Sequence, residues 1–156
     1  LESFQAANIS KDFKLIITIP DHDPLAKVFF EKYGKTDQIV FLGEIPWKEN
    51  IEYMIFADTV IIASSLESWC LSLQEAKLLN KDIIAPKIPY VKETLNGYHK
   101  VTLFDCLKVE SISSAIEVSV SESVRVGWTI AENNQTSKTS LLNVILDIKR
   151  DTKCTY

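Results

Sequence analysis

The chain has 156 residues, of which 46% are hydrophobic and 24% charged, and its formal net charge is −4. This size fits one globular domain with its own core, and the acidic balance lacks the basic surface that binds nucleic acid or anionic membranes. Cys70, Cys106 and Cys154 form no Cys-x-x-Cys pair, so we expect reduced thiols. No apolar run approaches the ~20 residues of a membrane span, so we expect no membrane-spanning segment.

Short apolar runs rich in β-branched residues alternate with segments of helical length. This alternation is typical of parallel strands joined by crossover helices. The runs are almost continuously apolar, as expected of strands that are covered by helices on both faces. Strands are predicted over residues 14–19, 38–42, 59–63, 82–85 and 101–104. The fold class predicted is therefore α/β with a parallel sheet.

The segments between these strands carry helix signals. The chain opens in a helix-like segment at Leu1, and Asp23-Pro24 forms an N-cap and first helical residue for a helix that ends at Tyr33. Further helices are expected over residues 47–56, 69–79, a short stretch after Pro89, and 109–120. We expect residues 121–156 to be an extension made of a polar loop and an amphipathic helix.

A parallel sheet binds ligands at the carboxyl ends of its strands, where helix N-termini offer N–H groups to anions. Three loops at such positions hold polar residues, at 20–23, 43–46 and 64–67. In the first loop, Asp21, His22 and Asp23 are adjacent, and adjacent residues do not easily converge on one ion. Because Asp23 is already explained as a helix cap, we predict no metal site.

Glu67 ends the third loop, and Glu75 follows eight residues later, about two turns into the next helix. A loop carboxylate can accept hydrogen bonds from sugar hydroxyls, and a carboxylate on the helix can bind a ribose diol. The N–H groups of Ser68, Trp69 and Cys70 are expected to open the helix and to receive a pyrophosphate. The alternative is a capping carboxylate followed by a solvated acid on the helix surface.

The segment Ser64-x-x-Glu67-x7-Glu75-Ala76 resembles the Glu-x7-Glu signature of retaining glycosyltransferases of the GT-B fold, the glycosyl transferases of group 1. The order of elements from about residue 14 to 120 resembles that family too. The matching pieces are Phe41-Leu-Gly43, Ala57-Asp58, residues 82–86 and Leu103-Phe104. The resemblance implies a Rossmann-like three-layer sandwich that forms the C-terminal half of a GT-B enzyme.

The family's functional residues map onto positions of this chain. By the resemblance, Glu67 is the catalytic residue that contacts the donor sugar, and Glu75 binds the donor ribose. Gly43, Glu44 and Ile45 would line the base, Ser68, Trp69, Cys70 and Leu71 would receive the distal phosphate, and Ser64 and His22 would lie beside the donor. No metal or other cofactor is implied, because the nucleotide-sugar is itself the activated substrate.

The resemblance further implies a hexosyltransferase of the cytoplasm that acts in polysaccharide biosynthesis. Its partners would be a nucleotide-diphospho-sugar and the acceptor domain of the same full-length chain, through which any contact with the inner face of a membrane would be made. We expect residues 1–156 to lack that N-terminal domain and the family's first strand, and hence to transfer nothing alone. A nucleotide-sugar epimerase or hydrolase, or a non-catalytic binding module, remains the alternative.

Overall fold

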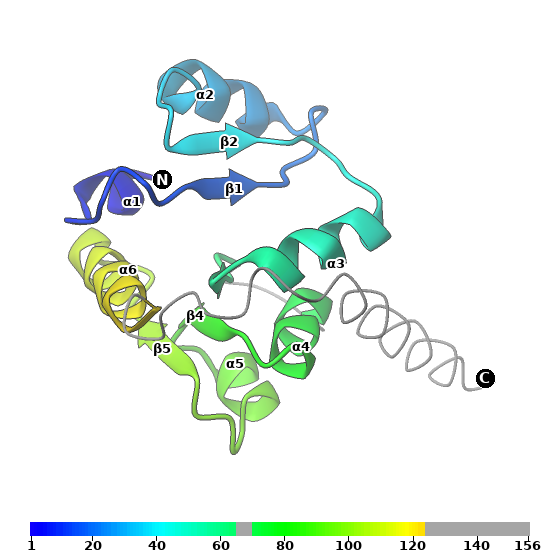
Figure 1. The fold of residues 1–156 in the computed structure, drawn as a ribbon, viewed down its shortest axis with the longest axis vertical. Coiled ribbons are helices and arrows are strands. Elements are labelled where there is room, and N and C mark those ends of the chain that lie inside the picture. The colour runs from blue at the N-terminus through cyan, green and yellow to red at the C-terminus, as the bar shows by residue number, and fades with distance from the viewer. Residues whose placement is uncertain (65–69, 124–156) are drawn as a thin grey trace, which may run out of the picture. The chain divides into compact units, whose positions relative to one another are not determined.

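The computed structural model describes residues 1–64 and 70–123, all within Leu1–Arg125, the larger of two units into which the chain divides. Six helices and five strands alternate along these residues in the predicted order (Figure 1). They are α1 (Glu2–Ala6), β1 (Leu15–Ile17), α2 (Pro24–Tyr33), β2 (Ile39–Phe41), α3 (Trp47–Phe56), β3 (Thr59–Ile61), α4 (Leu71–Leu78), β4 (Asp82–Pro86), α5 (Pro89–Thr94), β5 (Val101–Phe104) and α6 (Val109–Ser123).

All strand pairs among the described residues are parallel, and they form two sheets. Strand β1 pairs with β2, with Leu15 opposite Ile39. In the other sheet β4 lies between β3 and β5, so that Ile83 is opposite both Val60 and Val101. The α/β fold class and the parallel pairing are confirmed. The division into two sheets is a detail that apolar patterning does not reveal, because patterning marks strands and not their hydrogen-bond partners.

Both sheets contribute to one hydrophobic core. Its buried members come from helices and strands across the described chain, namely Phe4, Tyr33, Ile39, Ile84, Phe104, Ala115 and Ile116. Beside them, Ile51 of α3 and Leu73 of α4 are completely buried, at 0% exposure. Helical spacing predicts Ile51, Met54 and Ile55 on one face of α3; Ile51 and Met54 are buried, and Ile55 is half-buried. Helices α3 and α4 thus each bury part of their apolar surface, and a connecting loop follows the carboxyl end of each strand.

Local sequence sets the helix ends. Asp23 caps α2, because its Oδ1 accepts a hydrogen bond of 2.8 Å from the backbone N–H of Leu25, and Pro24 follows as the first helical residue. Helix α3 begins at Trp47 directly after Pro46, as predicted. Helix α6 continues to Ser123, so three residues of the expected extension 121–156 are helical, and residues 124–156 lie outside the described part of the chain.

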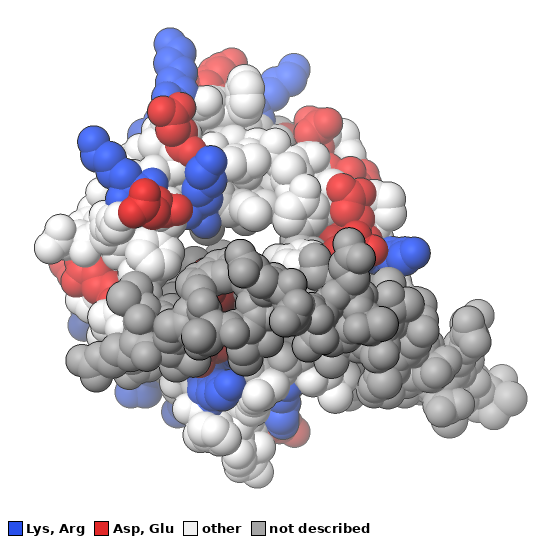
Figure 2. Space-filling model, viewed as in Figure 1, with Lys and Arg blue, Asp and Glu red and all other residues white. Residues whose placement is uncertain are grey.

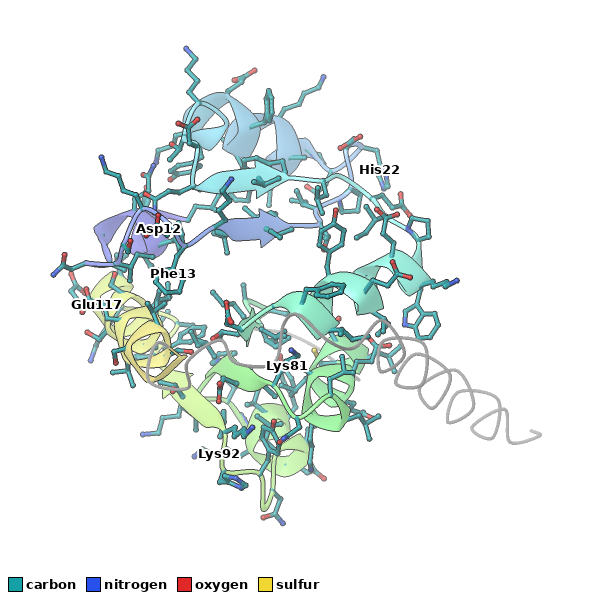
Figure 3. All side chains as sticks on the ribbon, viewed as in Figure 1. Asp12, Phe13, His22, Lys81, Lys92 and Glu117 are labelled. Atoms are coloured by element: carbon teal, nitrogen blue, oxygen red, sulfur yellow. The ribbon has the colours of Figure 1, made fainter. Side chains whose placement is uncertain are left out.

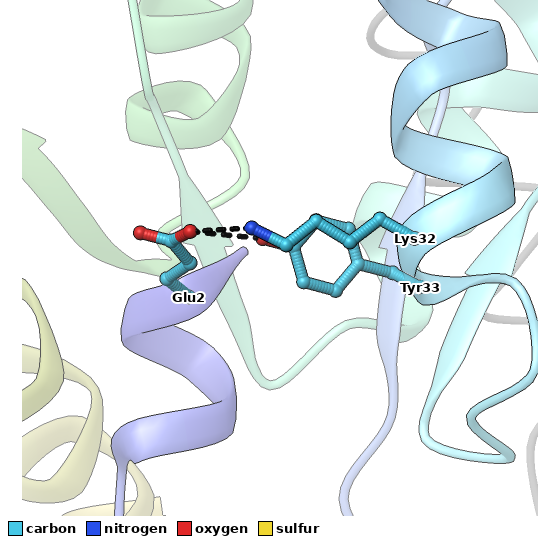
Figure 4. A network of polar contacts seen from close by, with 3 residues as sticks. All are labelled: Glu2, Lys32 and Tyr33. Carbon is cyan, nitrogen blue, oxygen red and sulfur yellow. Dashed lines mark hydrogen bonds and ion pairs between the residues drawn. The ribbon is translucent and has the colours of Figure 1, made fainter.

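Polar contacts attach the first helix to two later ones. Glu2 Oε1 of α1 accepts hydrogen bonds from Lys32 Nζ at 2.6 Å and from Tyr33 Oη at 3.4 Å (Figure 4). The hydrogen bond from Lys32 holds the pKa of the Glu2 carboxyl below its ordinary value. Beyond α1, the backbone N–H of Asn8 donates to Glu117 Oε1 of α6 at 2.6 Å. These bonds fix α1 against α2 and α6.

The end of α3 is held by the lysine that directly precedes β4. Lys81, labelled in Figure 3, donates from Nζ to the backbone carbonyls of Ile55 at 2.6 Å and Ala57 at 2.9 Å. Carbonyls at a helix C-terminus have no partner within the helix and carry partial negative charge, so a cation is favourable there. Burial of the ammonium group lowers the pKa of Lys81. This contact fixes one end of α3, and the other end reaches the loops described next.

Candidate functional site

The loops that follow β1 and β2 touch each other. His22 Nδ1 of the first loop lies 3.9 Å from Glu44 Oε2 of the second, and both side chains are exposed, at 79% and 72%. Gly43 is buried and has φ +71°, and a Cβ at this position would lie 2.6 Å from Asp21 Oδ1. The two loops therefore approach so closely that only a residue without a side chain fits at Gly43. His22, Gly43 and Glu44, all predicted site residues, come together here.

A buried carboxylate lies on α4. Glu75 is only 7% exposed, and its Oε1 accepts a hydrogen bond of 2.7 Å from Nε1 of Trp47, the first residue of α3. A charged group persists in such surroundings when hydrogen bonds replace its lost hydration. The prediction that Glu75 is a solvated acid on the helix surface, offered as the alternative to a binding role, is therefore wrong.

The loops after β3 and β4 are also joined. Tyr90 Oη of α5 donates to the backbone carbonyl of Ser64 at 3.0 Å. Beside this contact, Cys70 is buried at 9% exposure and precedes α4 as its N-cap residue. A cavity of about 470 Å³ opens between α4 and α5, and its lining residues are Cys70, Gln74, Lys77, Leu78, Tyr90, Glu93 and Thr94. Ser64 and Cys70 thus lie close to a space that the sequence did not predict.

The start of α4 differs from the prediction. The helix begins at Leu71 and not at residue 69, because the backbone of Cys70 is extended, with φ −76° and ψ 92°. Glu75 is then about one turn into the helix instead of two. The N–H groups free to meet an anion in the first turn belong to Leu71, Ser72 and Leu73, whereas Ser68, Trp69 and Cys70 were expected to supply them. Cys70 is the N-cap of this helix, so its expected role at the distal phosphate stays a prediction; Glu67, Ser68 and Trp69 lie outside the described residues.

Two further predicted residues take ordinary positions near the site. Leu71, the first residue of α4, is 55% exposed, and Ile45 is half-buried in the loop between β2 and α3. Neither side chain is polar, so any part they take in ligand binding is through backbone groups or apolar contact.

Comparison with known proteins assigns the chain to a family. The family model for glycosyl transferases group 1 matches residues 4–134. The chain belongs to this family. Among solved structures, a sucrose-phosphate synthase from Thermosynechococcus elongatus is similar, with a TM-score of 0.55 and 15% sequence identity. The match covers 88% of this chain and 37% of the synthase. This likeness shows the fold, and the chain spans 37% of the length of that synthase. Comparison with curated proteins gave no match.

Sequence reasoning missed two aromatic residues of this group 1 glycosyltransferase chain. The sequence predicts Trp47 only as the first residue of a helix, and it assigns Tyr90 no role in the site. Both stand at the first or second position of a helix that follows a strand, the part of a parallel fold where ligands bind. An aromatic residue with a polar tip at such a position is a signal that would have found them.

The charges of the glycosyltransferase chain are unevenly spread around these loops. Figure 2 shows acidic side chains gathered on the side where the loops after β1 and β2 lie. Asp21, Asp23 and Glu44 belong to these loops.

Among residues 1–64 and 70–123, no three His, Cys, Asp or Glu side chains lie close enough together to hold a metal ion. The same residues include no helix that is both long and apolar enough to cross a bilayer.

A second cavity lies at the opposite end of the larger sheet. It measures about 190 Å³ and is lined by residues at the amino ends of β4 and β5 together with Ser119 of α6. It contains none of the predicted site residues. Ligands of parallel sheets bind at the carboxyl ends of strands, so the loops around Gly43, Ser64 and Glu75 are the better candidate.

Proposed function

We propose that this chain is the donor-binding half of a retaining glycosyltransferase, which binds a nucleotide-diphospho-sugar. The observation that carries the proposal is the buried carboxylate of Glu75, held by Trp47 next to the loop 43–46, in a chain of the group 1 family. A carboxylate can accept several hydrogen bonds, of which the neutral indole N–H supplies one. A pair of ribose hydroxyls is a ligand of matching chemistry.

The resemblance to the family suggests roles for the remaining residues. Glu67 would contact the donor sugar, the backbone from Gly43 to Ile45 would line the base, and the start of α4 at Leu71 would meet the distal phosphate. Ser64 and His22 would lie beside the donor. No metal is required by this assignment, because the diphosphate leaving group can be stabilised by hydrogen-bond donors and cations of the protein.

The acidic loops after β1 and β2 bear on how catalysis would proceed. A diphosphate that leaves the sugar develops negative charge, which acidic neighbours do not stabilise. We propose that the necessary cations come from an acceptor-binding domain or another part of the full-length chain, and that residues 1–156 bind donor weakly and transfer no sugar alone. The rate enhancement would then come from positioning two substrates between two domains. The acceptor would be a saccharide or a lipid-linked saccharide.

Calorimetric titration tests the proposal. UDP, GDP, ADP and their glucose conjugates are titrated into the 156-residue chain and into the variants Glu75→Ala and Glu31→Ala. Loss of a hydrogen bond to a charged group corresponds to about 1.5–3 kcal/mol, so Glu75→Ala should weaken binding by roughly 10- to 100-fold. Glu31, an exposed residue of α2, is the matched control because its replacement removes the same charge away from the site.

The outcomes separate the proposal from its alternatives. Binding of one nucleotide that Glu75→Ala weakens and Glu31→Ala does not supports a donor site. Equal affinities for all three proteins would place the nucleotide elsewhere, and no binding of any compound would favour a non-catalytic module. Breakdown or epimerisation of the nucleotide-sugar without an acceptor would point to a hydrolase or an epimerase.

A further inference from the structure

The hydrogen bond between Trp47 and Glu75 joins two helices 28 residues apart in the sequence. Its length of 2.7 Å lies at the short end of the range for charge-assisted N–H···O bonds. Because Glu75 is 7% exposed, water competes little for this bond, and hydrogen bonds are stronger in such surroundings. The contact is therefore a strong constraint on the Glu75 side chain.

The rigid indole of Trp47 restricts the orientation of the Glu75 carboxylate to which it is hydrogen-bonded. A glutamate has three side-chain torsions, and the last one is broad, so an unrestrained carboxylate samples many orientations. The indole of Trp47 is rigid and has only two torsions, and Pro46, which precedes it, has a fixed φ. A bond from this indole to Oε1 sets the plane of the carboxylate. Unlike lysine or arginine, the indole N–H brings no positive charge to the carboxylate.

We propose that Trp47 is a positioning residue, which orients the Glu75 carboxylate so that it accepts hydrogen bonds from the ribose hydroxyls of the donor. This inference rests on the proposed function, because it takes Glu75 as the ribose-binding residue. Trp47 acts through Glu75 and directly follows the loop 43–46 that is expected to line the base. Helix α3 would thereby tie recognition of the base to recognition of the ribose.

The variant Trp47→Phe tests the inference, because it keeps an aromatic ring and removes the N–H donor. UDP, GDP and ADP are titrated together with their 2′-deoxy counterparts, and the ratio of the two affinities is measured for each protein. For the wild type we expect a preference for the ribonucleotide of about 10-fold or more, the size of one hydrogen bond to a charged group. For Trp47→Phe we expect the preference to fall below about 3-fold on the same grounds, with little change for the 2′-deoxy compound.

Tyr98→Phe is the matched control. It also removes one donor from an aromatic ring, since Tyr98 Oη donates to the backbone carbonyl of Lys81 at 2.5 Å, before the start of β4. This variant should keep the wild-type preference. If Trp47→Phe lowers the affinities for both compounds equally, or leaves the preference intact, Trp47 has a structural role only and the inference is overturned. If the wild type binds nucleotide without any preference, the ribose role of Glu75 fails and the inference fails with it.

A second measurement applies if Trp47→Phe does not fold. The chain has three tryptophans, so its ¹H–¹⁵N spectrum contains three indole signals, which Trp69→Phe and Trp128→Phe assign by elimination. We expect the Trp47 indole proton to shift upfield in Glu75→Gln, because the acceptor loses its charge, and to move when the bound nucleotide is added to the wild type. A Trp47 signal that is unchanged in both experiments would overturn the inference.

Discussion

Replacement of Gly43 by alanine tests the close approach of the loops after β1 and β2. The backbone of Gly43 is left-handed, with φ +71°, and an added Cβ would lie 2.6 Å from Asp21 Oδ1. Left-handed backbone costs an L residue about 1–2 kcal/mol, of which the smaller entropy of the unfolded alanine chain offsets about 0.4–1 kcal/mol. Displacement of the Asp21 carboxylate from its rotamer adds about 0.5–1.5 kcal/mol. We therefore expect Gly43→Ala to lower the free energy of unfolding by about 2 kcal/mol.

Gly97→Ala separates the two costs. Gly97 has φ +74°, but an added Cβ there meets no atom within 4 Å, so only the backbone cost remains, at about 1 kcal/mol. The assay is urea unfolding followed by circular dichroism, with an unchanged m-value as evidence that the two-state transition is intact. In the double variant Asp21→Ala/Gly43→Ala, we expect the extra cost at Gly43 to disappear. A Gly43→Ala variant as stable as the wild type, or no rescue by Asp21→Ala, would refute the reasoning.

Two further predictions concern the core and the attachment of α1. Leu73→Ala should lower the free energy of unfolding by about 3 kcal/mol, because removal of a completely buried side chain leaves a cavity. Leu78 lies on the same helix and is 60% exposed, so Leu78→Ala should lower it by less than about 0.5 kcal/mol. Similar urea midpoints for the two variants would contradict this packing. The hydrogen bond from Lys32 lowers the pKa of Glu2 from its ordinary value of 4.5. The contribution of the Glu2 carboxylate to the stability of the fold is therefore complete above pH 4.5 and is lost as the pH falls through the lowered pKa. The wild type should thus be more stable than Glu2→Gln at neutral pH and equal to it in strong acid, and a difference that persists in acid would argue against the Glu2–Lys32 contact.

Local signals in the sequence were sufficient for most of the fold. The cap at Asp23, the proline at the start of α2 and the apolar spacing of Ile51 and Met54 act within a few residues, and α2 and α3 have the predicted bounds. Strand pairing is different, because it depends on hydrogen bonds between residues far apart in the chain. The division into two sheets and the later start of α4, where Cys70 is extended, could not be read from local pattern.

The candidate site was predictable in part. Gly43, Glu44 and Ser64 follow strands and Glu75 lies on the next helix, as the sequence predicted, and their roles in binding stay predictions. The burial of Glu75 and its bond to Trp47 were not predictable, because the partners are 28 residues apart and nothing in the spacing pairs them. The roles of Glu67, Ser68 and Trp69 stay predictions.

Helix α3 is anchored at both ends by side chains, to α4 through the Trp47–Glu75 bond and to Lys81, the residue directly before β4. Its ten residues separate these anchors by about 15 Å. A substitution at Lys81 that releases the last turn could therefore tilt the first turn and misdirect the Glu75 carboxylate. Loss of ligand binding in a Lys81 variant would then be an effect at a distance, and a screen for ligand-contacting residues in this fold should not count it as direct contact.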